Sequence, residues 1–259
     1  MSEAFGDQVL LLAERSVVRT LRQPANVVFP LVFPLLLLAV NAGGLDSATR
    51  LPGFPTDSYV AFALAIPFIQ GALFATMNAG TDLGRDIQTG FLNRLSLTPM
   101  RGVALLAGQL GGVVTMGLVQ ALVYLGVGLV VGVRLESGPL GALVLLAFAV
   151  VVSIGFGALG AFAALRTGSS EAVQGLFPVF FVFLFISSMS MPRDLIEIDW
   201  FRVAATANPV SYLIECVRSL IITGWDGEAL ALGFGIAGAI MVVALALATV
   251  SLRTRLARS

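Results

Sequence analysis

The sequence contains no lysine and no histidine, and its one cysteine is Cys216. All fifteen basic residues are therefore arginine. Without lysine the chain cannot form the phosphate-binding loop of common ATPases or a Schiff base. Without histidine it lacks the usual catalytic triads and the commonest metal ligand, and one cysteine excludes an internal disulfide. We therefore expect no catalytic residue, metal or cofactor in this chain, so any ATP must be hydrolysed by another chain.

Charge is also scarce, since 12% of the 259 residues are charged, 58% are hydrophobic and the mean hydropathy is +0.96. This composition excludes an ordinary water-soluble globule and indicates an integral membrane protein. The formal net charge is zero, so nothing points to nucleic acid as a partner. A spanning helix needs about 20 apolar residues, which leaves room for six spans. We expect an all-α integral membrane protein with one transmembrane domain over residues 1–259.

Six apolar segments have the composition of membrane spans, and they cover residues 24–43, 58–80, 103–133, 140–165, 172–190 and 228–251. The first contains Pro30 and Pro34, whose freed carbonyl groups must be satisfied by neighbouring helices. Pro178 interrupts the fifth. Residues 3–23 precede the first span with an amphipathic pattern, which predicts a helix lying in the membrane interface.

A short polar stretch, residues 81–101, separates the second and third spans and carries Asp82, Arg85, Asp86, Arg94 and Arg101. Its apolar residues recur every four positions, which predicts a helix with one apolar face. Gly84 and Gly90 weaken that helix, so we expect two short pieces that end before Pro99. The stretch is either an ordinary loop or a docking element for a partner protein, and we favour the docking element.

Polar side chains also occur inside the predicted spans, at Gln70, Asn78, Gln109, Gln120 and Ser153. Such residues often mark a transport pathway, but they equally form hydrogen bonds between helices. Both interpretations stay open. The third span also carries glycine pairs that would allow close helix packing, Gly108 with Gly112 and Gly128 with Gly132.

Residues 191–226 are too polar for a span and too apolar for an ordinary loop. Half-apolar segments of this kind favour re-entrant or interfacial helices. Glu215 and Arg218 lie three positions apart, so they could pair across one helical turn.

The distribution of arginine predicts the orientation. With both termini in the cytoplasm, ten arginines lie inside and five lie outside. The excess of positive charge on cytoplasmic loops favours this arrangement. We expect a multi-pass protein of the plasma membrane with both termini cytoplasmic.

Two stretches contain motifs. The first combines Arg85-Asp86, Gly90-Phe91-Leu92, Arg94-Leu95 and Thr98-Pro99. The second runs from Met191-Pro192 to Gly224 through Asn208-Pro209-Val210-Ser211-Tyr212, Glu215 and Arg218. Together they resemble the membrane permease subunits of ABC type-two exporters, which include daunorubicin-resistance permeases and permeases for polysaccharide and teichoic acid. The chain departs from that pattern by having no lysine near the first stretch and Ser187-Ser188-Met189-Ser190 where the family often has Ser-Gly.

The resemblance implies a homodimer of permeases, or alternatively a heterodimer, surrounded by membrane lipid. It also implies two ATPase subunits, which would bind ATP and Mg. Residues implied to couple to the ATPase are Asp82, Arg85, Asp86, Gly90, Phe91, Leu92, Arg94 and Pro99. Those implied for outer re-entrant helices that act as a gate are Pro192, Asn208, Pro209, Tyr212, Glu215 and Arg218.

The expected function is export of an amphipathic drug or lipid-like molecule, because the short outer loops leave no extra domain for a carbohydrate. An exporter of a lipid-linked polysaccharide is the alternative transporter. A non-transporting membrane scaffold is a further alternative. A membrane-embedded enzyme is disfavoured, because the spans lack converging ionisable residues.

Overall fold

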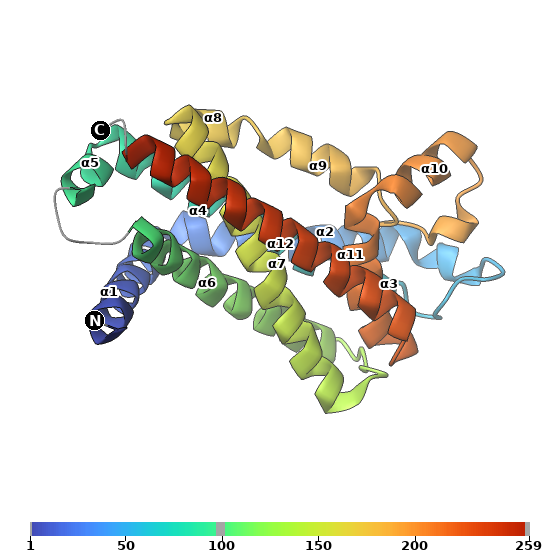
Figure 1. Cartoon of the computed structure of the whole chain (residues 1–259). Helices are drawn as coiled ribbons and strands as arrows, with labels where there is room; N and C mark the ends of the chain where they lie inside the picture. Colours follow the sequence, from blue (N-terminus) through green and yellow to red (C-terminus); the bar gives the residue numbers. More distant parts are fainter. Residues whose placement is uncertain (1, 97–101, 257–259) are drawn as a thin grey trace.

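The computed structural model describes residues 2–96 and 102–256, and within these ranges the chain folds into helices without a strand (Figure 1). The long helices are α2 (Pro24–Leu45), α4 (Ala65–Gln88), α6 (Gly102–Val130), α7 (Gly138–Thr167) and α12 (Gly227–Leu256). Among the described residues, five helical segments are long and apolar enough to cross a membrane. The protein is therefore an all-helical, multi-pass membrane protein.

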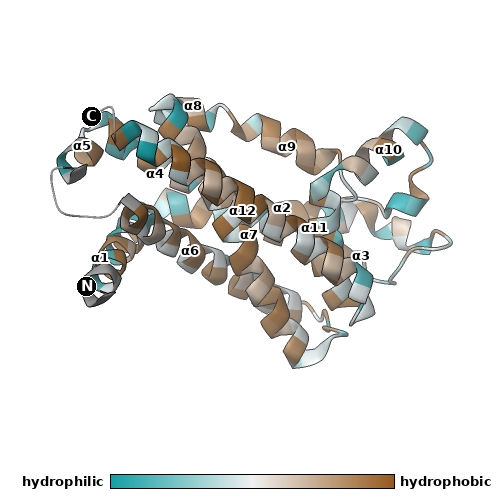
Figure 2. Cartoon of the chain, in the orientation of Figure 1, coloured by the Kyte–Doolittle hydropathy of each residue, from teal (hydrophilic) through white to brown (hydrophobic). Residues whose placement is uncertain are grey.

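Shorter helices gather at the two ends of the bundle (Figure 1). One end holds α1 (Ser2–Leu21), α5 (Phe91–Ser96) and α8 (Ser170–Gln174), together with the last turns of α12. The opposite end holds α3 (Tyr59–Ala63), α10 (Asp199–Ala207) and α11 (Pro209–Arg218). Figure 2 shows hydrophilic residues concentrated at these ends and hydrophobic residues along the helices between them.

Helix α2 passes through both of its prolines without ending. Pro34 has no N–H to give to the carbonyl group four residues earlier, which is that of Pro30. The hydroxyl of Tyr124 on α6 donates a hydrogen bond to this Pro30 oxygen instead. A neighbouring helix thus satisfies the carbonyl freed by Pro34, as the sequence led us to expect.

The expected fifth span, 172–190, is not one helix. α8 ends at Gln174, and α9 (Phe177–Phe185) has nine residues. Nine residues rise about 14 Å, less than half of the roughly 30 Å of a hydrocarbon core. Pro178 lies in the first turn of α9, where the missing N–H costs nothing, so the break comes before it. A sixth crossing in this region stays a prediction.

The helix of the second span continues further than expected. Within the polar stretch, residues 81–88 are the last turns of α4 and α5 follows after Gly90, so the expected two helical pieces are present, with the break at Gly90 and none at Gly84. The first piece is the end of a long helix and not a short helix of its own. Gly84 lies against α8, where an added Cβ would be 2.7 Å from the backbone N of Ser170. Close packing at this position outweighs the weak helix propensity of glycine.

The two glycine pairs predicted to allow close packing differ in what they contact. A Cβ at Gly108 would lie 2.3 Å from Cβ of Leu12, and one at Gly112 would lie 2.1 Å from Oγ of Ser16, so this pair allows α1 to pack closely on α6. Of the second pair, Gly128 contacts Leu64, whereas Gly132 has a φ of 96° beyond the end of α6 and contacts no side chain there.

Helix α4 is the central element of the bundle, because 18 of its 24 residues are buried. It meets α7 at two glycines. A Cβ at Gly160 would lie 2.0 Å from the carbonyl oxygen of Thr76, and one at Gly80 would lie 2.7 Å from the oxygen of Gly160. The two backbones therefore touch, and no larger residue fits between them.

We expect Gly160→Ala to destabilise the protein by about 2 kcal/mol or more, because the new methyl group must push α4 and α7 apart. The matched control is Gly238→Ala in α12, where an added Cβ meets nothing within 4 Å. That change should be neutral or stabilising by up to about 1 kcal/mol, since alanine favours helix. Thermal unfolding in a mild detergent measures both, and equal melting temperatures would contradict the close contact.

Candidate functional site

Two arginines of α1 face two aspartates of α4. Arg19 places Nε 3.3 Å from Oδ1 of Asp82 and Nη1 2.9 Å from Oδ1 of Asp86. Arg15 places Nη2 3.1 Å from the same Asp86 oxygen. Both aspartates are buried. We call these four residues the α1–α4 ion-pair cluster. Its carboxylates hold α1 against α4 and are not exposed to a partner.

From the sequence, Arg15 and Arg19 belong only to the polar face of the helix predicted over residues 3–23. A signal for their pairing was nevertheless present. The arginines lie four positions apart, as do Asp82 and Asp86. Residues at this spacing share a helix face, so two complementary faces were visible in the sequence. What was missing was the adjacency of α1 and α4 in space.

Among the expected coupling residues that the structure describes, Arg85 and Arg94 are exposed. Arg85 has Nη1 3.4 Å from Oε1 of Gln23, and Arg94 has Nη2 3.5 Å from the carbonyl oxygen of Thr89. Both contacts are long and solvated, so both guanidinium groups remain available to a partner. Pro99, also expected to couple, lies outside the described residues.

Three other expected coupling residues shape the turn between α4 and α5. Gly90 has a φ of 69°, a conformation that side chains disfavour, and it separates the two helices. Leu92 is buried. The ring of Phe91 lies beneath the Arg15 guanidinium, 4.1 Å from its centre. This cation–π contact attaches α5 to the α1–α4 ion-pair cluster.

Helix α8 supports the same end of α4 through Glu171, a residue that sequence reasoning missed. Gln88 donates a hydrogen bond of 2.9 Å to Oε2 of Glu171, and Ser169 donates one of 2.6 Å to the same oxygen. Hydrogen bonds from Ser169, from the backbone of Glu171 itself and from Gln88 lower the pKa of this carboxyl to about 2. It therefore stays ionised at neutral pH.

The expected translocation residues do not form one surface. Asn78, Gln109 and Gln120 line a narrow cleft of about 20 Å³ between α1, α4 and α6. That space suits roughly one water molecule. Nε2 of Gln109 donates a hydrogen bond of 3.0 Å to the oxygen of Ala79, which joins α6 to α4. Gln70 and Ser153 are buried outside this cleft.

At the opposite end, the buried guanidinium of Arg218 joins three segments. Nε donates to the oxygen of Phe62 at 3.2 Å, Nη1 to that of Ser188 at 3.1 Å, and Nη2 to that of Met189 at 3.2 Å. The guanidinium carbon also lies 3.5 Å from the centre of the Phe62 ring. Burial lowers the pKa of Arg218 to about 9, against the opposing effect of Glu215, so the side chain remains charged at neutral pH.

The expected pairing of Glu215 with Arg218 across a helical turn is wrong. Glu215 instead places Oε2 2.6 Å from Nη2 of Arg193. Arg193 also lies over the ring of Tyr212, 4.5 Å from its centre. Arg218 turns toward backbone carbonyl groups because α11 packs against α3 and the segment after α9, which bring these oxygens within reach.

The expected Asn208-Pro209 turn positions α11. Oδ1 of Asn208 accepts a hydrogen bond of 2.9 Å from the backbone N of Val210, while Pro209 occupies the first turn. Asparagine at the N-cap followed by proline is a favoured helix start. Nδ2 of Asn208 donates to the oxygens of Phe183 and Ile186, so the same side chain fastens the end of α9 to α11.

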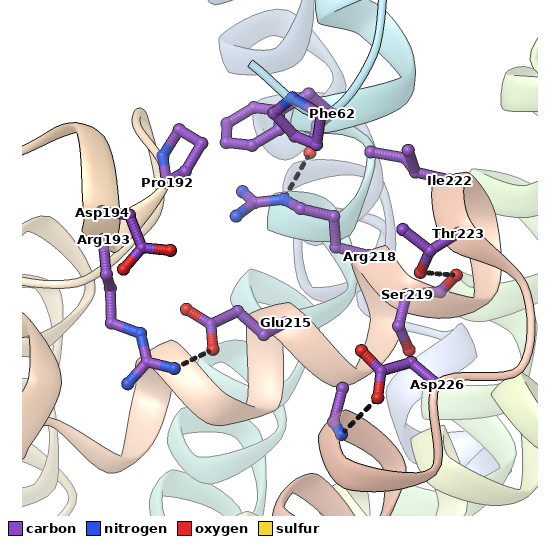
Figure 3. Close-up of a pocket in the computed structure, with 12 residues that line it drawn as sticks. Phe62, Pro192, Arg193, Asp194, Glu215, Arg218, Ser219, Ile222, Thr223 and Asp226 are labelled. Carbon is purple, nitrogen blue, oxygen red and sulfur yellow. Dashed lines mark hydrogen bonds and ion pairs between the residues drawn. The ribbon is translucent and has the colours of Figure 1, made fainter. Parts of the chain in front are cut away.

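Between these groups lies a cavity of about 320 Å³, which we call the Arg218 pocket (Figure 3). Pro192, Arg193 and Asp194 border one side, and Phe62 and Ile222 the other. All six expected gate residues belong to this end of the protein, and three of them line the pocket: Pro192, Glu215 and Arg218.

The fold and these sites define a multi-pass membrane permease. Residues 7–222 match the family described as ABC-2 type transporter, and the chain belongs to that family. It is 30% identical over 205 residues to "Daunorubicin resistance ABC transporter permease protein DrrB1" of Streptomyces coeruleorubidus, a match that spans 75% of this chain and 66%, just under two thirds, of that relative. It is 27% identical over 224 residues to "Probable doxorubicin resistance ABC transporter permease protein DrrC" of Mycobacterium tuberculosis, covering 85% and 79% of the two chains.

We expect Arg218→Met to cost at least about 3 kcal/mol of stability, because three buried carbonyl oxygens lose their donor. The stability of Arg218→Lys should lie between those of the wild type and Arg218→Met, since lysine keeps the charge but not the planar guanidinium group. Arg202→Met is the control, because Arg202 is exposed and pairs with an exposed Asp199, a contact worth less than about 1 kcal/mol. Melting temperatures in detergent test this, and equal losses for Arg218→Met and Arg202→Met would contradict a joining role for Arg218.

Proposed function

We propose that the chain is the membrane subunit of an exporter for an amphipathic drug or lipid-like molecule. A separate ATPase, present in two copies that bind ATP and Mg, supplies the energy. Membership of the ABC-2 type transporter family and the drug-resistance names of its relatives support this proposal. The absence of lysine from the chain agrees with an ATPase in another subunit.

The observation that carries the proposal is the continuity of α4. It runs as one helix from the exposed Arg85 at one end into the buried centre of the bundle. A partner that pushes on the turn between α4 and α5 therefore moves the core of the protein directly. Rigid-body displacement of packed helices is a common way in which such movements are transmitted.

The opposite end of this rod leads to the Arg218 pocket. Leu64 alone separates α4 from α3, and the oxygen of Phe62 in α3 accepts a hydrogen bond from Arg218. A displacement of α4 would thus strain the contacts that hold α11 and the segment after α9. In this mechanism, ATPase closure opens a path that the Arg218 contacts otherwise keep shut.

A second copy of the permease completes the proposed transporter. A homodimer is the simpler assembly, and a heterodimer with a related permease is the alternative. The protein would lie in the plasma membrane. Both of its termini would be in the cytoplasm, on the same side as α5. Besides lipid, the two ATPase subunits and the second permease are the partners we propose.

For the substrate, a wholly apolar cavity of about 410 Å³ supports an amphipathic molecule. It is lined by Leu73, Phe156, Phe183 and other residues of α4, α7, α9, α11 and α12. An apolar lining suits a hydrocarbon or aromatic group better than a carbohydrate. Export of a lipid-linked polysaccharide and a non-transporting scaffold remain the alternatives that the following experiment separates.

We expect Arg85→Glu and Arg94→Glu each to reduce substrate-stimulated ATP hydrolysis of the purified complex at least about fivefold, a typical lower limit of coupling between sites. Both side chains are exposed, so the amount of permease in the membrane should not change. Arg50→Glu, a change of another exposed arginine at the opposite end, is the control and should leave hydrolysis unchanged.

The stimulating compounds should be amphipathic drugs, phospholipids and lipid-linked glycans. Stimulation by the glycans alone would favour the polysaccharide exporter. A chain that never copurifies with an ATPase would favour the scaffold. Wild-type hydrolysis in both variants would remove the coupling role of this turn.

The orientation is tested with cysteine labelling in a Cys216→Ala background. A cysteine replacing Thr89, in the turn after α4, should react with a membrane-impermeant maleimide only after the cells are permeabilised. A cysteine replacing Gly227, at the start of α12, should react in intact cells. Both positions are exposed. Labelling of the Thr89 position in intact cells would overturn the proposed orientation.

A further inference from the structure

The Arg218 pocket lies at one end of the apolar part of the bundle. Asp226, directly before α12, and Ala229, in its first turn, help to line it, so it is level with the end of a long apolar helix. Trp225 is the neighbouring residue and is 52% exposed. Tryptophan is enriched where apolar spans meet water, which places this end of the bundle at the membrane interface.

The deep part of the pocket is positively charged. Arg218 is 7% exposed and keeps its charge, and a buried charge is normally compensated by a partner of opposite sign. Glu215 is already paired with Arg193 at 2.6 Å. The carbonyl groups of Phe62, Ser188 and Met189 accept from three of the five N–H groups of a guanidinium. An anionic group in the cavity would supply both the missing charge and the missing acceptors.

The mouth of the pocket is negatively charged. Asp194 and Asp226 are both exposed, and in Figure 3 the carboxylate of Asp194 lies on the side of Arg193 while Asp226 lies across the cavity. The lining as a whole contains two arginines and three acids, so it carries one net negative charge. A simple anion would meet repulsion on its way to Arg218. A ligand with both signs of charge would not.

We propose that the Arg218 pocket binds a zwitterionic head group, a phosphate joined to a primary amine. The phosphate oxygens accept hydrogen bonds from the remaining N–H groups of Arg218, a charge-assisted contact. The ammonium group lies toward Asp194 and Asp226. Oδ1 of Asp226 already accepts from the backbone N–H groups of Glu228 and Ala229, so Oδ2 is the atom that meets the ammonium.

Two sources could supply this chemistry, phosphatidylethanolamine in the adjoining leaflet and soluble phosphoethanolamine. The apolar part of the lining, with Phe62, Ile222 and Ala229, suits the lipid, whose glycerol and acyl groups extend beyond the head group. The inference depends only on the pocket and its place at the membrane interface, so it stands apart from the proposed transport function.

The test is isothermal titration calorimetry on the full chain, purified in detergent with the subunits that accompany it. The probes are dihexanoyl phosphatidylethanolamine, phosphatidylglycerol and phosphatidylcholine, together with phosphoethanolamine. Phosphatidylglycerol has no amine, and phosphatidylcholine has no N–H to donate. We expect the ethanolamine lipid to bind at least about tenfold more tightly than the other two lipids, the difference of one charge-assisted contact.

The double variant Asp194→Asn, Asp226→Asn should lose this preference, whereas Arg218→Lys should weaken all three lipids. Both aspartates are exposed, and asparagine at 226 keeps the oxygen that caps α12, so the double variant should fold even if Arg218→Lys does not. Glu228→Gln is the control, because Glu228 is exposed and does not line the pocket.

Equal binding of the three lipids, tighter binding of phosphatidylglycerol, or wild-type binding in the double variant would each overturn the proposal. Phosphoethanolamine that binds as tightly as the short-chain lipid would identify a soluble ligand as the source. Much weaker binding of phosphoethanolamine would identify the lipid.

Discussion

The burial of α4 is the constraint on which the rest of the structure depends. A helix surrounded by other helices cannot give its polar groups to water, so protein must satisfy them. Its close approach to α7 at Gly80 and Gly160 leaves no room for a larger side chain at that crossing. The surrounding helices pack on α4, which runs from one polar end of the bundle toward the other.

Arginine side chains hold separate segments together at both ends of the bundle, but their partners differ. At one end, Arg15 and Arg19 neutralise Asp82 and Asp86. At the other, Arg218 donates to carbonyl oxygens and forms no ion pair within the described part of the chain. The planar guanidinium can donate in several fixed directions, whereas lysine acts as a point charge. At these three positions lysine could not make the same set of contacts.

Much of the architecture could be predicted from composition and periodicity. Apolar length identified the long helices, because the hydrocarbon core demands about 20 residues per crossing. The start of α11 was predictable as well, since Asn208 and Pro209 act through contacts within a few residues. The end of α4 could not be predicted in this way, because its last turns depend on α8, which packs on Gly84 from more than 80 residues away in the chain.

The sequence by itself determined that this is a helical membrane protein and supplied the motifs that resemble a permease, because hydropathy and motifs do not depend on folding. Only the tertiary structure decided the partners of the charged residues. Glu215 and Arg218 are near neighbours in the chain, yet one binds Arg193 and the other the oxygen of Phe62, 156 residues away. A guanidinium binds the acceptors that packing brings within reach, and spacing along one helix cannot reveal those.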